Sequence, residues 1–133
     1  MIRRWLRRWL AVPEVRAIRG AITVPSDDAT AIREAVLELL REVRRENQFD
    51  DGDVISAIFT VTPDLTAAFP AETARRSGWT HVPLLCMQEI AVPGGMPRCL
   101  RVLVHVQRHW QESAPTHVYL RDAATLRPDL VRV

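Results

Sequence analysis

Four charged side chains stand in stretches of sequence that are otherwise apolar, and they are the residues best suited to chemistry. Arg101 heads the run Arg-Val-Leu-Val-His-Val, and Glu89 closes the run Leu-Leu-Cys-Met-Gln-Glu. Arg19 lies within Ala-Ile-Arg-Gly-Ala, and Arg127 lies within Leu-Arg-Pro-Asp-Leu. A guanidinium stays charged at every accessible pH, so burying one without an anion is costly. Each of these arginines must therefore meet a protein carboxylate or a bound anion.

Two interpretations of these charges remain open from the residues alone. Strand alternation separates Arg101 from its apolar neighbours Val102 and Val104, and an internal ion pair with Glu89 would neutralise it. However, three arginines and one glutamate are more than one structural ion pair requires. A small anionic ligand with two carboxylates would also satisfy them, because guanidinium forks bind carboxylates well.

Other reaction classes lack the residues that they need. All 18 basic residues are arginine, which excludes Schiff-base chemistry on a lysine. The serines lack a nucleophile-elbow context, and the four histidines lack zinc-site spacing. The two cysteines, Cys86 and Cys99, form no paired motif, so neither a metal site nor a disulfide framework is predicted.

Length and charge bound the remaining possibilities. A chain of 133 residues is sufficient for one domain with a real core. The formal charge of +2 is concentrated in the arginines near the N-terminus, so the rest lacks the broad basic face that nucleic-acid binding needs. No apolar run approaches the ~20 residues of a membrane span, and no secretory signal is evident. We expect a cytoplasmic protein that binds neither nucleic acid nor membrane.

The hydrophobic pattern predicts an α+β domain. The chain shows five strand patterns and two helix patterns, which alternate at first and end in three strands. We expect a mixed five-stranded sheet with two main helices on one face. The predicted strands are 16–24, 54–61, 82–90, 98–106 and 117–120. The first predicted helix begins after the capping residues 26–28, and the second spans 66–76.

Residues 1–15 are predicted to be a basic, amphipathic N-terminal extension to a domain that spans 16–133. Apolar side chains at 5, 6, 9 and 10 could share one face of a short helix, and four arginines would occupy another. Either a helix that binds a membrane surface or a partner, or a disordered tail, is compatible with this pattern.

Seven segments, in order and at near-constant spacing, resemble the AroH-class chorismate mutases. The resemblance covers nearly the whole chain from Arg16 onward. The segments are RAIRGA (16–21), TPDLTAAFPA (62–71), SGW (77–79), VPLLCMQE (82–89), RCLRV (98–102), HVYL (117–120) and LRPDL (126–130).

The resemblance implies a homotrimer built as a pseudo-α/β barrel, with three active sites in clefts between adjacent subunits. Its substrate would be chorismate, a dianion that rearranges to prephenate in aromatic amino acid biosynthesis. An ether bond breaks as a carbon–carbon bond forms within one molecule, so no cofactor or metal is needed. A reactive-intermediate deaminase on a similar scaffold, or a non-catalytic small-molecule-binding trimer, remains the alternative.

The resemblance also implies roles for particular residues. Arg101 would stabilise the negative charge that develops on the ether oxygen. Arg19 and Tyr119 would bind substrate carboxylates, while Glu89 and Cys86 would contact the ring hydroxyl, with Glu89 orienting the substrate and not acting as a base. The apolar wall would comprise Phe69, Ala71, Leu84 and Leu85, and the rim would carry Arg75 and Arg127.

Four features depart from the family pattern or need explanation. Glu72 stands where family members often carry lysine, and Leu85 replaces a polar residue; both changes, with the short tail after Leu130, are expected to affect binding before chemistry. Positions 86 and 89 point to opposite faces of a regular strand. If Cys86 and Glu89 meet one hydroxyl, a bend or bulge should lie between them.

Overall fold

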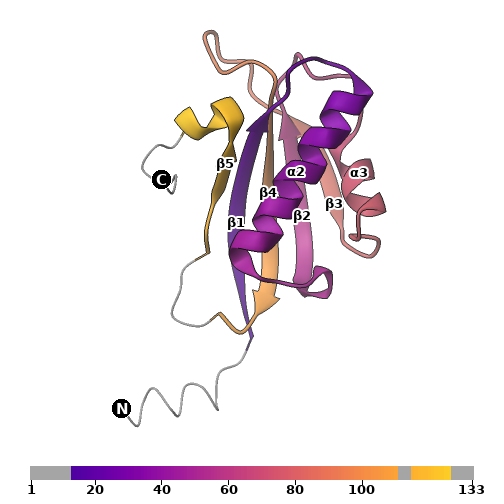
Figure 1. Cartoon of the computed structure of the whole chain (residues 1–133), viewed down its shortest axis with the longest axis vertical. Coiled ribbons are helices and arrows are strands. Elements are labelled where there is room, and N and C mark those ends of the chain that lie inside the picture. Colours follow the sequence, from indigo (N-terminus) through magenta and orange to yellow (C-terminus); the bar gives the residue numbers. More distant parts are fainter. Residues whose placement is uncertain (1–12, 111–114, 127–133) are drawn as a thin grey trace.

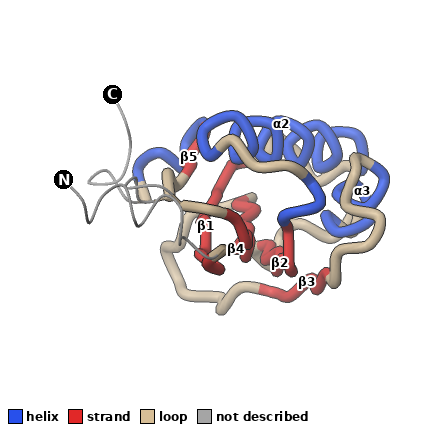
Figure 2. Tube along the Cα trace, turned by 90° about the horizontal axis from the view of Figure 1, so that it is seen from below, coloured by secondary structure: helices blue, strands red, loops and turns tan. Residues whose placement is uncertain are grey.

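A five-stranded mixed sheet with two helices on one face forms the domain (Figures 1 and 2). The structure, a computed structural model, describes residues 13–110 and 115–126. This architecture confirms the predicted α+β class. The strands are β1 (Glu14–Thr23), β2 (Val54–Val61), β3 (Leu84–Gln88), β4 (Cys99–Arg108) and β5 (Val118–Leu120). The helices are α2 (Ala29–Asn47), α3 (Pro70–Arg76) and the short 3-10 helices η1 (Asp51–Asp53) and η2 (Arg121–Thr125).

Strand β4 is the centre of the sheet, whose order is β3-β2-β4-β1-β5. It pairs antiparallel with both β1 and β2, whereas the edge strands β3 and β5 run parallel to their neighbours. Parallel pairing needs a crossover, and α3 lies in the crossover between β2 and β3. The loops on either side of α3 therefore deliver residues to the β3 edge.

Helix α2 covers one face of the sheet with a continuous apolar stripe, as the sequence predicts. Its buried side chains, which include Ile32, Val36, Leu39, Leu40 and Val43, pack on β1, β2 and β4. Neither α2 nor α3 covers the opposite face, called here the open face (Figure 2). Near the β5 edge of this face, η2 packs its buried Ala123 against Ala21, Cys99 and Tyr119. The alternation of strand side chains thus decides which residues enter the core and which reach the open face.

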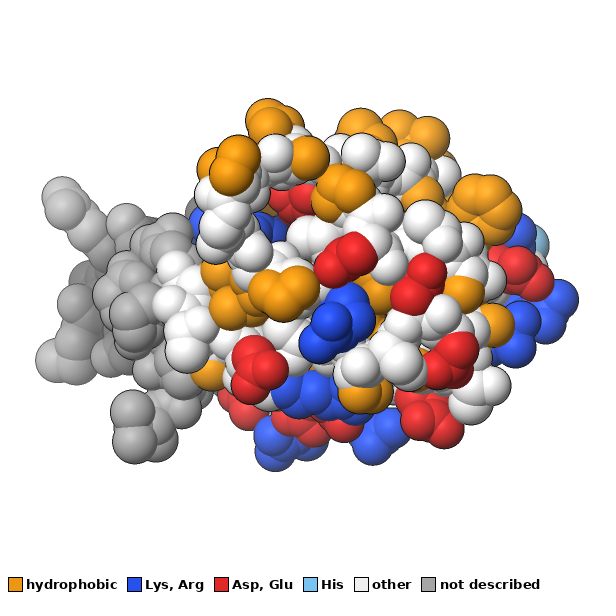
Figure 3. Space-filling view, turned by 90° about the horizontal axis from the view of Figure 1, so that it is seen from above, with side chains coloured by type: hydrophobic (Ala, Val, Ile, Leu, Met, Phe, Trp, Pro, Cys, Tyr) orange, Lys and Arg blue, Asp and Glu red, His pale blue; other side chains and the backbone are white. Residues whose placement is uncertain are grey.

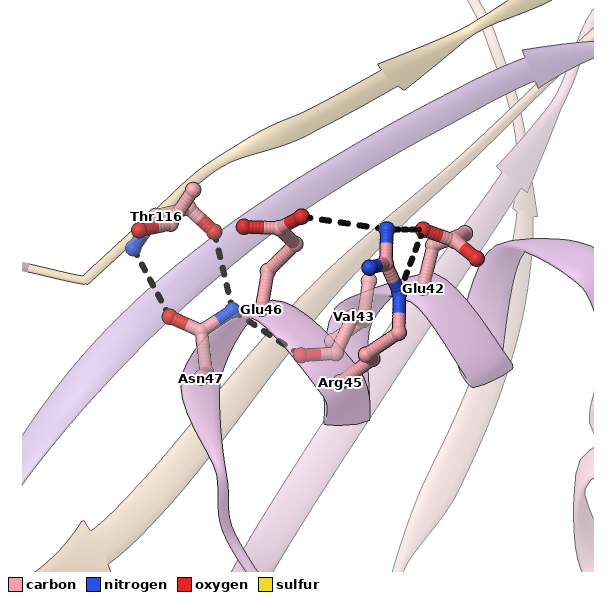
Figure 4. Close-up of polar contacts among 6 residues, drawn as sticks. All are labelled: Glu42, Val43, Arg45, Glu46, Asn47 and Thr116. Carbon is pink, nitrogen blue, oxygen red and sulfur yellow. Dashed lines mark hydrogen bonds and ion pairs between the residues drawn. The ribbon is translucent and has the colours of Figure 1, made fainter. Parts of the chain in front are cut away.

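Local hydrogen bonds fix both ends of α2. Asp28 caps the first turn, where its Oδ1 accepts a hydrogen bond of 2.8 Å from the Ala31 N–H. At the other end, buried Asn47 joins α2 to the segment before β5 (Figure 4). Its amide donates 2.9 Å hydrogen bonds to the carbonyls of Val43 and Thr116, and its Oδ1 accepts a 2.7 Å bond from the Thr116 N–H.

The element boundaries differ from the prediction where tertiary contacts intervene. Strand β1 begins at Glu14, two residues before the predicted strand, because Glu14 and Val15 pair with the long β4. Helix α3 begins at Pro70 instead of residue 66. The N–H groups of Thr66 and Ala67 are bound by the Asp27 carboxylate, and a residue before proline avoids helical geometry. The predicted extension lies outside the described residues except for its last three.

Candidate active site

A row of side chains crosses the open face from one edge strand to the other. In the strand register, Ala21 pairs with both Tyr119 and Arg101. Thr60 in turn pairs with both Arg101 and Met87. Paired residues of neighbouring strands project to the same face, so Arg101 sits in the middle of this row with small Ala21 between it and Tyr119.

Arg101 faces Glu89, as the internal ion-pair interpretation of the sequence expects. Its Nε lies 3.1 Å from Glu89 Oε1, and the two side chains are 35% and 24% exposed. The contact lacks hydrogen-bond geometry, however, and Arg101 Nε is buried without a hydrogen-bond partner in the described chain. The ion pair therefore lowers the free-energy cost of burying the Arg101 charge, but it leaves the Arg101 Nε–H group without a hydrogen bond.

Thr60 is a site residue that the sequence analysis missed. Its hydroxyl donates a 2.5 Å hydrogen bond to Glu89 Oε1, the oxygen that also faces Arg101. The available signal was a polar side chain near the end of the mostly apolar run Val-Ile-Ser-Ala-Ile-Phe-Thr-Val. Only the cross-strand register reveals that this threonine stands beside the arginine.

Tyr119 and Arg19 flank the central arginine on the open face. Tyr119 is 8% exposed, and its buried hydroxyl has no hydrogen-bond partner among the described residues. Arg19 lies two residues before Ala21 on β1 and pairs with Leu103. The backbone N–H of Arg19 donates a 3.0 Å hydrogen bond to His117 Nδ1. The strand register therefore places these two residues and Arg101 on one face of the sheet.

A second group of predicted residues gathers on the other side of β3. Cys86 pairs with buried Phe59, and its Sγ accepts a 3.4 Å hydrogen bond from the Ala71 N–H at the start of α3. A hollow of about 380 Å³ opens beside it, lined by Cys86 and by Phe69, whose side chain is 70% exposed. Leu84 packs partly against the core here.

Strand β3 separates the two groups, and the expected bulge is absent from it. Its pairing with β2 is continuous from Leu84 to Gln88, and the Glu89 N–H extends the ladder with a 2.8 Å bond to the Val61 carbonyl. Regular alternation therefore directs Cys86 toward α3 and Glu89 toward the open face. The predicted bend is wrong, and the two side chains do not converge on one side of this chain.

The remaining predicted residues lie at the margins. Leu85 projects from the edge strand on the open face and is 62% exposed. Arg75 is exposed in the last turn of α3 and does not line the hollow of the described chain. Arg127 lies outside the described residues.

A buried thiol, that of Cys99, lies beside Arg101. Burial raises the pKa of the Cys99 thiol, and the nearby Arg101 guanidinium opposes that shift only in part. Cys99 therefore stays neutral beside the arginine.

Within 13–110 and 115–126, no group of three His, Cys, Asp or Glu side chains could hold a metal ion. Over the same residues, no helix is long and apolar enough to cross a membrane.

The sequence pattern of the family described as chorismate mutase type I matches residues 15–130. This chain belongs to the type I chorismate mutase family. It is 50% identical over 117 residues to chorismate mutase AroH of Thermus thermophilus, covering 87% of this chain and 96% of that protein. It is 43% identical over 117 residues to chorismate mutase AroH of Bacillus subtilis, covering 87% and 92%.

The fold agrees with this family membership. The solved chorismate mutase of Clostridium thermocellum superposes with a TM-score of 0.79 at 46% identity, covering 83% of this chain and 98% of that one. The matched region of the type I chorismate mutase family includes every predicted site residue from Arg19 to Arg127.

Proposed function

We propose that this protein is a chorismate mutase that rearranges chorismate to prephenate for aromatic amino acid biosynthesis, acting in the cytoplasm as a homotrimer. The observation that carries the catalytic assignment is a pair of unmet donors. Arg101 Nε and the Tyr119 hydroxyl are both buried, lie on one row and have no hydrogen-bond partner in the described chain. Buried donors of native proteins are nearly always bonded, and a carboxylated ligand would satisfy these two.

Arg101 supplies the electrostatic part of catalysis. As the ether bond of chorismate breaks, its oxygen gains electron density, and a guanidinium already fixed in a partly buried site stabilises that charge without reorganising. Glu89 contributes to the fixation by facing Nε at 3.1 Å. The reaction moves electrons within one molecule, so no protein group has to transfer a proton or form a bond.

The other open-face residues hold the substrate in its compact reactive shape. Arg19 and Tyr119 bind carboxylates, and Glu89 accepts a hydrogen bond from the ring hydroxyl through the oxygen that Thr60 leaves available. Fixing a flexible molecule in a reactive conformation can account for several kcal/mol of a barrier. Arg127 and Arg75 complete the rim of the site.

The division of the site by β3 supports active sites that are shared between subunits. Within one chain, the group around Arg101 and the group around Cys86 and Phe69 face away from each other across the edge strand. A ligand can contact both kinds of surface if a neighbouring copy supplies the second. Exposed apolar side chains suited to such an interface follow β3 and its loop, at Leu85, Met87, Ile90 and Val92.

The distribution of surface charge also favours this arrangement. In Figure 3, which shows the end of the molecule where α2 begins, charged side chains gather on the side of the helices. Apolar side chains gather along the opposite rim, on the side of the open face. An apolar rim of this kind is typical of a surface that another subunit covers.

An assay of the full chain with chorismate tests the proposed reaction. We expect chorismate to disappear and prephenate to form with no added metal or nucleotide. Hydrolysis of an enamine or imine without chorismate turnover would instead identify a reactive-intermediate deaminase. Binding of chorismate without product would identify a non-catalytic binding protein.

A mixing experiment tests the shared site. Arg101→Ala removes a residue of the first group and Phe69→Asp one of the second, and Phe69 is exposed enough to tolerate the change. If each site takes one group from each of two copies, subunit exchange between these two inactive variants restores activity in some sites. Each variant subjected alone to the same exchange is the control. Absence of any gain after demonstrated exchange would contradict a shared site.

A further inference from the structure

Arg33 projects from the start of α2 to the hollow beside Cys86 and Phe69. It lines that hollow of about 380 Å³ and also a second one of about 270 Å³ between α2 and α3. Glu72 is the other charged residue common to both linings. Arg33 therefore stands at the border between the outer surface and the proposed substrate-binding hollow.

The position of Arg33 relative to Phe69 is fixed by a clamp at the start of α2. The Asp27 carboxylate accepts hydrogen bonds of 2.8 Å from the Thr66 N–H, 2.8 Å from the Thr66 hydroxyl and 3.0 Å from the Ala67 N–H. These bonds hold the loop that leads to Phe69 against the first turn of the helix. Side chains of an α-helix lean toward its N-terminus, which is the direction of this loop.

The charge balance at the hollow leaves Arg33 as its uncompensated group. Glu72 forms an ion pair with Arg76, at 2.9 Å, one turn along α3. In the part of the chain that the structure describes, Arg33 makes no ion pair or hydrogen bond through its side chain. Arg33 and Glu72 are the charged residues that line the hollow beside Cys86, whereas Arg76 lines only the second hollow. Because Glu72 is already paired with Arg76, the positive charge of Arg33 is the one at this mouth that no carboxylate of the described chain offsets.

We propose that Arg33 is a substrate-binding residue that draws a carboxylate of the incoming dianion to the hollow and holds it there. This inference rests on the proposed chorismate mutase function and adds a residue that the sequence analysis did not select. An exposed guanidinium acts mainly on encounter and ground-state binding, because solvent screens it from the reacting bonds. Its contribution is to substrate capture and not to the chemical step.

Steady-state kinetics of Arg33→Ala, beside Arg41→Ala as the matched control, test this role. Arg41 is exposed on the same helix but lines neither hollow. We expect Arg33→Ala to raise KM about tenfold with kcat unchanged, and Arg33→Lys to recover most of the loss. Added salt should raise the KM of the wild-type protein and of Arg41→Ala but change that of Arg33→Ala less.

The outcomes separate this inference from the function on which it rests. A wild-type chain that does not turn over chorismate contradicts the proposed function itself. Wild-type turnover with the same KM and salt dependence in Arg33→Ala as in Arg41→Ala overturns the role of Arg33 alone. A fall in kcat together with a lower Tm would also overturn it, since that pattern indicates a structural role for the residue.

Discussion

Thr60 donates a hydrogen bond to the same Glu89 oxygen that faces the Arg101 guanidinium. The three residues come from three adjacent segments of the sheet, and the register fixes Thr60 directly opposite Arg101. The threonine thus orients the carboxylate, and the carboxylate in turn balances the arginine. Positioning of this kind acts through Glu89 and not by contact with the reacting bonds.

Thr60→Val should therefore impair catalysis while preserving the fold. Valine matches the shape of threonine but cannot donate, so Glu89 loses one partner and is free to turn toward Arg101. A hydrogen bond to a charged group contributes about 1.5–3 kcal/mol, and we expect kcat/KM to fall at least about tenfold. Steady-state kinetics measure this loss, and Thr60→Ser, which retains the hydroxyl, should recover activity. Equal loss in both variants would contradict the positioning role.

Gly20→Ala should destabilise the domain by overpacking. A Cβ at this position of β1 would lie 3.0 Å from Val102 Cγ1 and 3.1 Å from Leu39 Cδ1, beneath α2. Overpacking of this kind costs about 1–3 kcal/mol in the free energy of unfolding. Chemical denaturation provides the measurement, with Gly52→Ala as the control because its added Cβ meets nothing within 4 Å. Identical midpoints for the two variants would refute the close packing of α2 on β1.

Asp27→Ala should raise KM, because the loop that carries Phe69 loses its attachment to α2. The pKa of Asp27 is held below the ordinary value of 3.8, chiefly by the hydrogen bond from the Thr66 N–H and next by the one from the Thr66 hydroxyl. A lowered pKa means that the stabilisation is complete above about pH 4 and is lost as the pH falls through the lower folded-state value.

Asp27→Asn provides the control for the charge of this clamp. Its amide oxygen can accept from both N–H groups, so KM near neutral pH should change less than in Asp27→Ala. The rate of proteolysis within the 65–69 loop, measured across acidic pH, should increase on acidification in the wild-type protein. In Asp27→Asn this increase should be smaller. A loop equally protected in all three proteins would disprove the clamp.

Asn47→Ala should lower the free energy of unfolding by about 1–3 kcal/mol, because it leaves the partly buried N–H and carbonyl of Thr116 without these partners. Glu46→Ala is the comparison, since Glu46 takes part in a surface ion pair with Arg45 (Figure 4). Thermal unfolding of the two variants should give a clearly lower Tm only for Asn47→Ala. A matching Tm would argue against the attachment of α2 to the segment before β5.

Local sequence signals predicted the elements whose ends are set locally. Strand β2 was predicted at Val54–Val61 with both ends correct, because a turn precedes it and Thr-Pro follows it. The start of α2 was likewise evident from its capping aspartate. The start of α3 was missed because it depends on Asp27, about 40 residues earlier in the chain.

The site was predictable in its residues more than in its arrangement. An arginine and a glutamate in apolar strands indicate a charged site, but Thr60 is recognisable only from the register between β2 and β4. Alternation alone placed Cys86 and Glu89 on opposite faces. The bulge was expected only if Cys86 and Glu89 of the same strand meet one hydroxyl, and the regular pairing of β3 is compatible with a site to which two chains contribute these residues separately.

Arg101 is the residue on which the proposed chemistry depends most, and its replacement is the most direct measurement. Arg101→Ala is expected to lower kcat for the conversion of chorismate to prephenate by at least about 10²-fold, as for loss of a donor to a developing oxyanion. The kcat of Arg101→Lys, which retains a charge but not the planar fork, should lie between those of Arg101→Ala and the wild-type protein. Folded Arg101→Ala that forms prephenate at the wild-type rate would contradict electrostatic stabilisation by this guanidinium.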